Sequence, residues 1–343
     1  MAENRYLRWL SSQTASIYWH DSAIIEELDE ALGNGAVGQT TNPFLMASAL
    51  KAQPDFWRSV LPGVPEDVQG DARAEEWTAQ AAGWLAKNKL APLLGKGEYA
   101  GYVCAQTNPC KPGDAAGTIA TARRYASMGK NIVVKIPATR AGLEAIEACA
   151  SEGINVTATV SHTVPQVLAM AEAYQRGRQR AVEKGIEPGI GIAVLMIGRL
   201  DDYLRDVMND TRAGAAEADI RWAGIAVFKR AYELFKERRY DCMLMPAGSR
   251  GAYHISEISG ASMVMSIAPV IADALSSETD FTEKIDRPVE PAILERLCGM
   301  PEFLKAYEPD GMTVNEFIAY GAFNRTLDQY MQVGWNILRD IVL

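Results

Sequence analysis

Lys135 is the residue whose surroundings most directly suggest chemistry. It lies in an apolar, β-branched run over residues 131–139, which has the composition of a buried strand. Lysine is rarely buried without a partner or a task, and burial favours its neutral amine. A neutral amine can attack a ketone and form a Schiff base. The alternative is a lysine at a strand end whose ammonium group extends into water, and the strand alone does not separate the two.

The composition excludes several classes of function. The chain has 343 residues and a net charge of -9, which disfavours a nucleic-acid or anionic-membrane binder, although a local arginine pair could still hold a small anion. The 5 cysteines and 3 histidines are scattered without metal-ligand spacing, and this cysteine usage is typical of a reducing compartment. The N-terminal segment lacks an apolar signal core, and no run is long enough to span a membrane. We therefore expect a cytoplasmic protein without a bound metal.

Short apolar runs alternate with amphipathic helical patterns along most of the chain. The helical patterns cover residues 115–128, 140–151, 164–184 and 222–238, and the expected strands are 16–19, 36–41, 101–106, 132–137, 155–160, 191–196, 242–247 and 262–267. This alternation predicts an α/β protein, a single (β/α)8 TIM barrel over residues 1–343. A doubly wound open sheet is the alternative, but a Gly-rich phosphate loop after the first strand is missing. Extra helices are expected at the N-terminus, in an insertion over 47–99 after the second strand, and over 289–343.

Polar residues gather where these strands end. In a (β/α)8 barrel the active site lies at the C-terminal ends of the strands. Isolated polar residues at such positions are usually caps and turns, but a set placed around a buried lysine indicates a site. The set consists of His20, Asp21, Gln39 to Asn42, Gln106 to Asn108, Lys135, Thr157, Thr159, Ser249 and Arg250.

Two of these segments resemble a known family. GQTTNPFLM is similar to the Thr-Asn-Pro signature of transaldolases, and VVKIPATRAGLEAIEACASEGINVTATVSHTVPQV is similar to their Schiff-base lysine strand, the helix after it and the next strand. The resemblance extends over most of the chain, from Asp21 to Pro269. The chain is identified by it as a member of the transaldolase and fructose-6-phosphate aldolase superfamily.

The resemblance implies a role for each matched residue near the lysine. Lys135 would form the Schiff base with a ketose phosphate. Asp21 resembles the carboxylate that handles protons on the donor hydroxyls, and Asn42 resembles the amide that hydrogen-bonds the donor. Thr159 resembles the hydroxyl that positions a catalytic water. On the sequence alone, Asp21 could instead be the N-cap of a following helix.

The same resemblance implies a phosphate site. Arg199 and Arg250 match the arginines that hold a substrate phosphate, and Ser249 lies beside Arg250. Guanidinium groups suit this task because they form bidentate, charge-assisted hydrogen bonds with phosphate oxygens. The alternative for both arginines is a surface ion pair.

The chain departs from the family at its proton-transfer groups. Transaldolases carry a glutamate where this chain has Gln106, which cannot titrate. The fructose-6-phosphate aldolases also have glutamine there, but they use a tyrosine where this chain has Met196, and Val194 replaces a small polar residue. His162, three residues after Thr159, is the first candidate for the missing acid/base because its reference pKa is near 6.5. The alternative is that His162 only packs or caps the next helix.

We therefore expect a class I, transaldolase-like enzyme that transfers a three-carbon dihydroxyacetone unit from a ketose phosphate to an aldehyde. The alternatives are a fructose-6-phosphate-aldolase-like lyase and a catalytically weak, sugar-phosphate-binding barrel. The iminium serves as the electron sink, so the chemistry requires no metal or organic cofactor. The expected partners are small-molecule sugar phosphates, neither nucleic acid nor membrane, and a homo-oligomer is left open because family members form dimers or larger rings.

Overall fold

The computed structural model describes residues 3–211 and 214–343. In this part of the chain, eight parallel strands form one sheet in the order β7-β6-β5-β4-β3-β2-β1-β8. The edge strands β7 and β8 also contact each other, which nearly closes the sheet into a barrel. The predicted (β/α)8 architecture is confirmed. The strands are β1 (Ser16–His20), β2 (Gly38–Gln39), β3 (Val103–Gln106), β4 (Ile132–Pro137), β5 (Val156–Thr159), β6 (Gly191–Leu195), β7 (Met243–Pro246) and β8 (Met263–Ile267).

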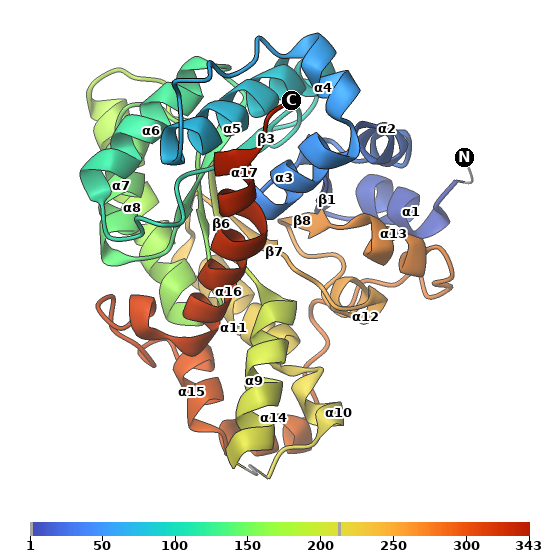
Figure 1. Cartoon of the computed structure of the whole chain (residues 1–343). Coiled ribbons are helices and arrows are strands. Elements are labelled where there is room, and N and C mark those ends of the chain that lie inside the picture. Colours follow the sequence, from blue (N-terminus) through green and yellow to red (C-terminus); the bar gives the residue numbers. More distant parts are fainter. Residues whose placement is uncertain (1–2, 212–213) are drawn as a thin grey trace.

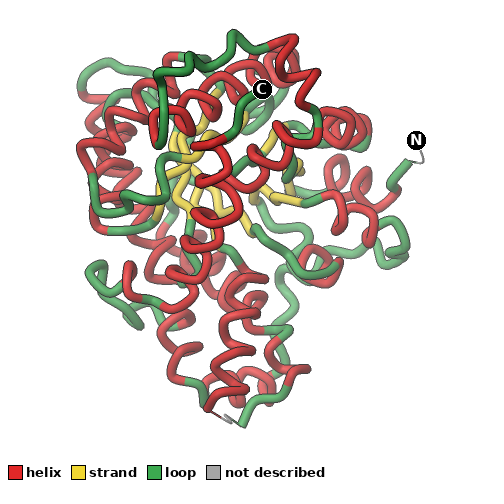
Figure 2. Tube along the Cα trace, in the orientation of Figure 1, coloured by secondary structure: helices red, strands yellow, loops and turns green. Residues whose placement is uncertain are grey.

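Helices surround these strands, as Figure 2 shows in red around the yellow strands. None of the described helices is long and apolar enough to cross a membrane. A helix precedes the first strand, others connect successive strands, and another follows the last strand. These are α1 (Arg5–Gln13), α2 (Ile25–Gly33), α6 (Ala115–Ser127), α7 (Arg140–Ala150), α8 (Val164–Glu183), α9 (Ile197–Thr211), α10 (Glu217–Ile220), α11 (Ala223–Arg238), α12 (Ala252–Ser256) and α13 (Pro269–Leu275).

Two further groups of helices extend the barrel, as predicted for residues 47–99 and 289–343. The insertion between β2 and β3 contains α3 (Pro43–Ala52), α4 (Pro54–Val60), α5 (Asp71–Leu85), the π-helix η1 (Ala86–Leu90) and the 3-10 turn η2 (Ala91–Leu93). The C-terminal group contains α14 (Pro291–Cys298), α15 (Pro301–Tyr307), η3 (Phe317–Ala319), α16 (Gly321–Tyr330), the π-helix η4 (Met331–Trp335) and α17 (Asn336–Asp340).

The second strand is much shorter than the predicted range 36–41. Only Gly38 and Gln39 are in strand conformation, and the Trp19 ring lies directly over Gly38, where a Cβ would come within 2.3 Å of it. The backbone nevertheless stays beside β1 on both sides of the strand. Val37 N donates to Tyr18 O and Thr40 N donates to His20 O. The polar residues after β2 are therefore held at the same end of the barrel as those after β1.

The turn after β4 is tight and well anchored. Thr139 is the N-cap of α7, and its hydroxyl accepts from Gly142 N at 3.0 Å while donating to Pro112 O at 2.6 Å. A Cβ at position 142 would lie 1.9 Å from the Pro137 carbonyl oxygen, so only glycine permits this approach of helix to strand. The end of β4, which carries Lys135, is thus tied both to α7 and to the loop after β3.

The C-terminal helices α16, η4 and α17 form one continuous helical segment, residues 321–340, drawn in red in front of the strands in Figure 1. This segment, called here the C-terminal arm, contacts α9 at one end and α3 and α5 at the other. Both α9 and α3 begin at the C-terminal ends of strands. A Cβ at Gly334 would lie 2.5 Å from Phe44 N, so the arm packs directly on the backbone at the start of α3.

Candidate active site

Lys135 lies in β4, of which every residue is buried, and is itself 3 % exposed. Its Nζ donates to Thr41 O, two strands away, at 3.4 Å, a long contact. Among the described residues no carboxylate oxygen lies within 4.0 Å of this nitrogen. Register places Lys135 beside Gln106 on β3 and Thr157 on β5. The predicted nucleophile is therefore a buried lysine with one weak hydrogen bond.

Gln106, the register partner of Lys135 on β3, and Thr159 at the end of β5 have unused hydrogen-bonding groups. Gln106 is 1 % exposed, and neither its Oε1 nor its Nε2 has a partner among the residues that the structure describes. The same holds for the Thr159 hydroxyl, which is fully buried. Buried polar groups are almost always satisfied by protein, water or ligand. This part of the barrel is thus built to receive a polar molecule.

Asp21 forms a small polar cluster at the ends of β1, β2 and β8. Thr40 Oγ1 donates to Asp21 Oδ1 at 2.6 Å, so the Ser266 hydroxyl, 2.7 Å from Thr40 Oγ1, is the donor in the second contact. The alternative that Asp21 is a helix N-cap is wrong, because α2 begins only at Ile25 and its N-cap is Ile24. The carboxylate is instead oriented by hydroxyl groups of the neighbouring strands.

Asn42 has a local structural role that the sequence analysis did not assign. It is the N-cap of α3, and its Oδ1 accepts from Leu45 N at 3.0 Å. Pro43 follows at the first helical position, where its missing N–H is not needed. The cap fixes the side chain next to Thr41, whose carbonyl oxygen contacts Lys135. The acceptor of the amide is therefore occupied, and Nδ2 is the group left to contact a substrate.

His162 is fully buried beneath the C-terminal arm. Its Nε2 lies 3.0 Å from the Thr326 hydroxyl on α16, and its Nδ1 has no partner in the described ranges. Burial, and to a lesser extent the charge of Arg199, lower the pKa of His162 to about 3. The imidazole is thus neutral and a weak base at physiological pH. These contacts favour the packing alternative over a proton relay.

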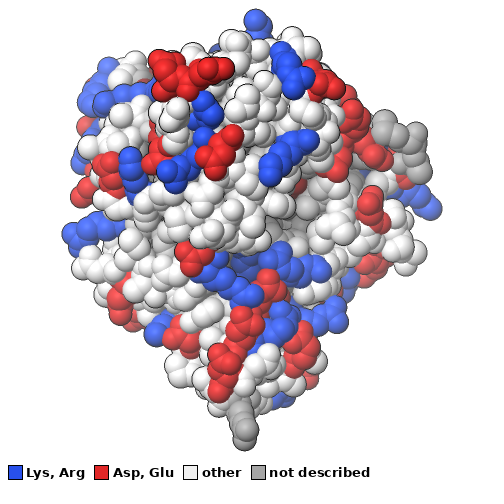
Figure 3. All heavy atoms as spheres, viewed as in Figure 1, with Lys and Arg blue, Asp and Glu red and all other residues white. Residues whose placement is uncertain are grey.

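Charged residues gather on the face of the molecule seen in Figure 3. Basic side chains (blue) and acidic side chains (red) interleave in its lower centre, over the region where Figure 1 places α9. Four arginines at the ends of β6 and β7 and on α9 and α16, called here the arginine rim, contribute to this network: Arg199, Arg205, Arg250 and Arg325.

The two predicted phosphate arginines are brought together by glycines. At Gly248, which has φ +64°, a Cβ would lie 3.5 Å from Arg199 Cγ. At Gly198 a Cβ would lie 2.2 Å from Gly248 O and 2.8 Å from Arg250 Cγ. The turn after β6 therefore packs against the backbone of the loop after β7. Ser249, between Gly248 and Arg250, has a buried hydroxyl oxygen without a partner in residues 3–211 and 214–343.

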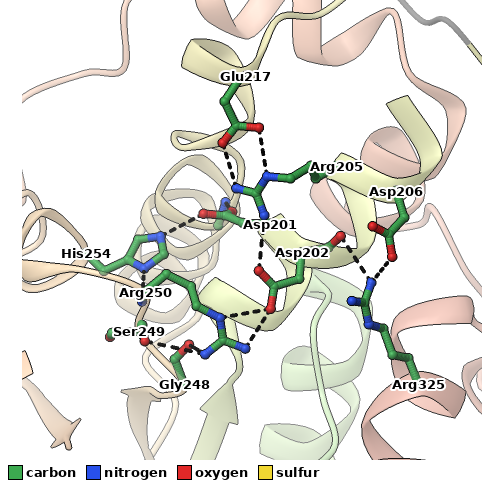
Figure 4. Close-up of polar contacts among 11 residues, drawn as sticks. Asp201, Asp202, Arg205, Asp206, Glu217, Gly248, Ser249, Arg250, His254 and Arg325 are labelled. Carbon is green, nitrogen blue, oxygen red and sulfur yellow. Dashed lines mark hydrogen bonds and ion pairs between the residues drawn. The ribbon is translucent and has the colours of Figure 1, made fainter. Parts of the chain in front are cut away.

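Asp202 holds the guanidinium of Arg250, as Figure 4 shows. Its Oδ2 accepts from Nε at 2.8 Å and from Nη2 at 2.7 Å, while Nη1 donates to Gly248 O at 2.9 Å. Burial acts to raise the pKa of Asp202, but Arg250, Arg205 and Arg325 outweigh it and hold the pKa below its usual range. The guanidinium has five N–H donors. One donor of Nη2 is left over, and the second donor of Nη1 makes only a 3.5 Å contact with Ser249 O.

Arg199 is held by the C-terminal arm. Its Nη1 donates to Gln329 Oε1, and its guanidinium carbon lies 5.2 Å from the centre of the Tyr330 ring, a cation–π contact. Arg325 on the same arm donates to Asp206 Oδ2 and to Asp202 O. The rim is therefore assembled from α9, the loop after β7 and the C-terminal arm, with contacts between residues as much as 130 positions apart.

Sequence reasoning missed the residues that orient the predicted ones. Asp202 could have been found, because it lies three residues after Arg199 on α9, but its partner Arg250 lies in the loop after β7. Thr40 was part of the polar run after β2 and received no role. Gln329 and Tyr330 carry no local signal, since only the path of the arm brings them to Arg199.

Comparisons with known proteins point in one direction. A family model described as Transaldolase/Fructose-6-phosphate aldolase matches residues 18–314. The protein named transaldolase of Neisseria meningitidis serogroup A is 30% identical over 211 residues, 60% of this chain and 58% of the relative. That of Alteromonas mediterranea is 25% identical over 336 residues, 93% of this chain and 96% of the relative. The chain thus spans less than two thirds of the Neisseria protein's length and nearly all of the Alteromonas protein's length.

Proposed function

Because the chain belongs to the transaldolase/fructose-6-phosphate aldolase family, we propose that it is a transaldolase-type transferase using a Schiff base on Lys135. It moves a three-carbon dihydroxyacetone unit from a ketose phosphate to an aldehyde. One observation carries this proposal. Lys135 is buried without a carboxylate within 4.0 Å in the described residues, and Gln106, its register partner on β3, and Thr159 at the end of β5 have buried polar groups without partners there.

The reaction begins at the Lys135 amine. The amine adds to the ketose carbonyl, and loss of water gives an iminium ion. The bond between the third and fourth carbons then breaks. Its electron pair enters the iminium to give an enamine, and the hydroxyl proton on the fourth carbon passes to a base as the aldehyde leaves. The enamine attacks the carbonyl carbon of the acceptor aldehyde, the new alkoxide takes a proton, and water releases the product ketose.

Asp21 is the proposed proton acceptor and donor. Its Oδ1 is held by Thr40, and its other oxygen makes no hydrogen bond within the described part of the chain. Gln106 and Thr159 would hold the water that enters in the hydrolytic step. Asn42 Nδ2 would donate to a hydroxyl of the three-carbon adduct. His162 is left out of this path because of its low pKa and its contact with Thr326.

Arg199, Arg250 and Ser249 are proposed to bind the substrate phosphate. The Nη edge of Arg250 still has donors when its Nε edge is occupied by Asp202. A phosphate could therefore bind end-on without displacing Asp202. The Ser249 hydroxyl would supply a neutral donor beside it.

A lyase related to the fructose-6-phosphate aldolases is the second candidate, and Gln106 favours it. A glutamine cannot serve as the acid/base of an ordinary transaldolase. If the enamine is protonated by water before an acceptor binds, the outcome is cleavage rather than transfer. A sugar-phosphate-binding barrel with weak catalysis is the third reading.

Reductive trapping distinguishes these candidates. The protein is incubated with a panel of phosphorylated and unphosphorylated ketoses, reduced with borohydride, digested and analysed by mass spectrometry. A three-carbon adduct on Lys135 supports the Schiff-base enzyme, while an adduct on exposed Lys130, or none with any ketose, contradicts it. Release of free dihydroxyacetone in the absence of an acceptor aldehyde separates the first two candidates, because the lyase protonates and hydrolyses the enamine, whereas the transferase keeps the three-carbon unit on Lys135 until an aldehyde binds.

A further inference from the structure

The loop after β7 is held by a buried hydrogen-bonded chain that the proposed mechanism does not use. Arg250 N donates to His254 Nδ1 at 3.0 Å, and His254 Nε2 lies 2.8 Å from Asp201 Oδ2. Asp201 Oδ1 in turn accepts from Gly224 N at 2.8 Å. His254 and Asp201 are both 0 % exposed. The chain connects the loop to α12, α9 and the start of α11, as Figure 4 shows for its labelled members.

The hydrogen bonds determine the tautomer of His254. The Nδ1 atom accepts from the Arg250 N–H, so it carries no proton. The proton of the neutral ring is therefore on Nε2, which donates to the Asp201 carboxylate. Asp201 also receives the Gly224 N–H at the positive end of α11, which suits an anion. Each of the three hydrogen bonds, from Arg250 to His254, from His254 to Asp201 and from Gly224 to Asp201, then has one donor and one acceptor. Only one orientation of the His254 ring allows this.

Two adjacent aspartates thus hold both ends of Arg250. Asp202 binds the guanidinium directly, and Asp201 acts on the backbone N–H through His254. Both aspartates lie on α9, and Arg199 lies in the first turn of the same helix. The close approach of Gly198 to Gly248 O requires the same placement of the loop. The backbone and the side chain of Arg250 are therefore fixed from one helix.

We propose that Asp201 and His254 are positioning residues for phosphate recognition, which hold the Ser249–Arg250 backbone in the orientation that binds the substrate phosphate. The inference rests on the proposed function for the identity of the ligand, a sugar phosphate. Neither residue would touch the substrate. Loss of the His254 acceptor would release the Arg250 N–H and let the loop move, while Lys135 and its neighbours remain in place.

Three substitutions of His254 separate positioning from packing. His254→Phe keeps a ring and removes both polar contacts. His254→Asn retains an acceptor near the position of Nδ1, and His254→Gln retains a donor near the position of Nε2. Tyr125→Phe is the matched control, because Tyr125 on α6 is also buried, but its hydroxyl has no partner in the described part of the chain.

The measurements are the dissociation constant for inorganic phosphate and KM and kcat for a phosphorylated ketose and its unphosphorylated analogue. We expect His254→Phe to weaken phosphate binding and raise KM for the phosphorylated ketose about tenfold. The KM for the analogue and kcat should stay near wild type. His254→Asn should recover most of the loss and His254→Gln little of it, while Tyr125→Phe should leave the ratio of the two KM values unchanged.

Equal phosphate affinity in His254→Phe and wild type, or a His254→Asn variant as weak as His254→Phe, would overturn the positioning role. If His254→Phe does not fold, the comparison of the Asn and Gln variants decides. Arg250→Ala tests the phosphate site separately from the positioning role of His254. If it leaves phosphate affinity unchanged, the phosphate site of the proposed function fails, whereas loss of affinity in Arg250→Ala alone contradicts only the role of His254.

Discussion

The barrel interior around Lys135 and the arginine rim satisfy their polar groups in opposite ways. In the interior, Gln106 and Thr159 have no partners among the described residues, and Lys135 makes one contact of 3.4 Å. In the rim, Arg250 is paired with Asp202, and Arg205 donates to Glu217 at 2.7 and 2.8 Å.

The difference shows two ways of preparing a site. Neutral groups can remain buried without partners at a moderate free-energy cost, so the interior can be shaped for a ligand that supplies the missing hydrogen bonds. The rim lies at the surface, where the side chains of Arg205, Arg250 and Arg325 are 30%, 37% and 49% exposed, so their ion pairs serve mainly to orient the guanidinium groups. A ligand would fill hydrogen bonds in the interior, whereas at the rim it would share donors that are already oriented.

The strongest test of the interior is Lys135→Met. Because the amine is the proposed nucleophile, we expect loss of reductive trapping and a fall in turnover of about 10³-fold or more. The melting temperature should not fall, since methionine replaces a buried group whose only hydrogen bond is long. Lys130→Met is the surface control. An adduct that persists in Lys135→Met would place the reaction outside the interior.

The matching test of the rim is Arg250→Ala. Charge-assisted hydrogen bonds contribute about 1.5–3 kcal/mol, so KM for a phosphorylated ketose should rise about 10- to 100-fold. The kcat and the KM for the unphosphorylated analogue should change little, because Lys135 is untouched. Steady-state kinetics with both substrates measure this. Equal changes for the two substrates would mean that Arg250 is structural.

Gln106→Glu tests whether an acid/base residue is the only group that the barrel interior lacks for three-carbon transfer. A carboxylate at this position should raise the rate of three-carbon transfer roughly tenfold and introduce a new ionisation into its pH profile. Gln106→Met, which fills the space without hydrogen-bonding groups, should lower the rate instead. If neither variant changes transfer with any ketose, the weak binding barrel becomes the better account of this chain.

Acid should weaken the two regions in different pH ranges. Burial lowers the pKa of His20 to about 4 and that of His162 to about 3, so the unfolded state binds protons first as the pH falls below about 6.5. Unfolding free energy should then fall by about 1.4 kcal/mol per pH unit and per histidine. The pKa of Asp202 is also lowered, so its contribution is present above the usual aspartate pKa and is lost as the pH falls below that value, in a more acidic range than for the histidines.

Urea unfolding across this pH range measures the effect. His20→Phe should reduce the slope between about pH 6.5 and 4 without altering the loss below that range. Asp202→Asn should do the reverse. An unchanged slope in His20→Phe would mean that His20 gains a polar partner in solution.

The fold followed from local patterns that survive in the tertiary structure. Parallel strands buried on both faces must be apolar along their length, so the run around Lys135 predicted β4 with its observed bounds, Ile132–Pro137. The tight caps at Thr139 and Asn42 are likewise local, because they involve residues three positions apart. The largest error in length was at β2, predicted over 36–41 and observed over Gly38–Gln39, and β3 begins two residues later than predicted.

The sequence by itself determined which residue types stand at the strand ends, and hence that a lysine, a carboxylate, amides and arginines share one end of the barrel. Only the tertiary structure decided how each is used. It brought His162 into contact with Thr326, and it brought Asp202 and His254 into hydrogen-bonding contact with Arg250. It also brought Gln329 to Arg199 from 130 positions away. Strand ends are set by short-range periodicity, whereas partners and pKa values depend on burial and on contacts between segments remote in the chain, which no local pattern encodes.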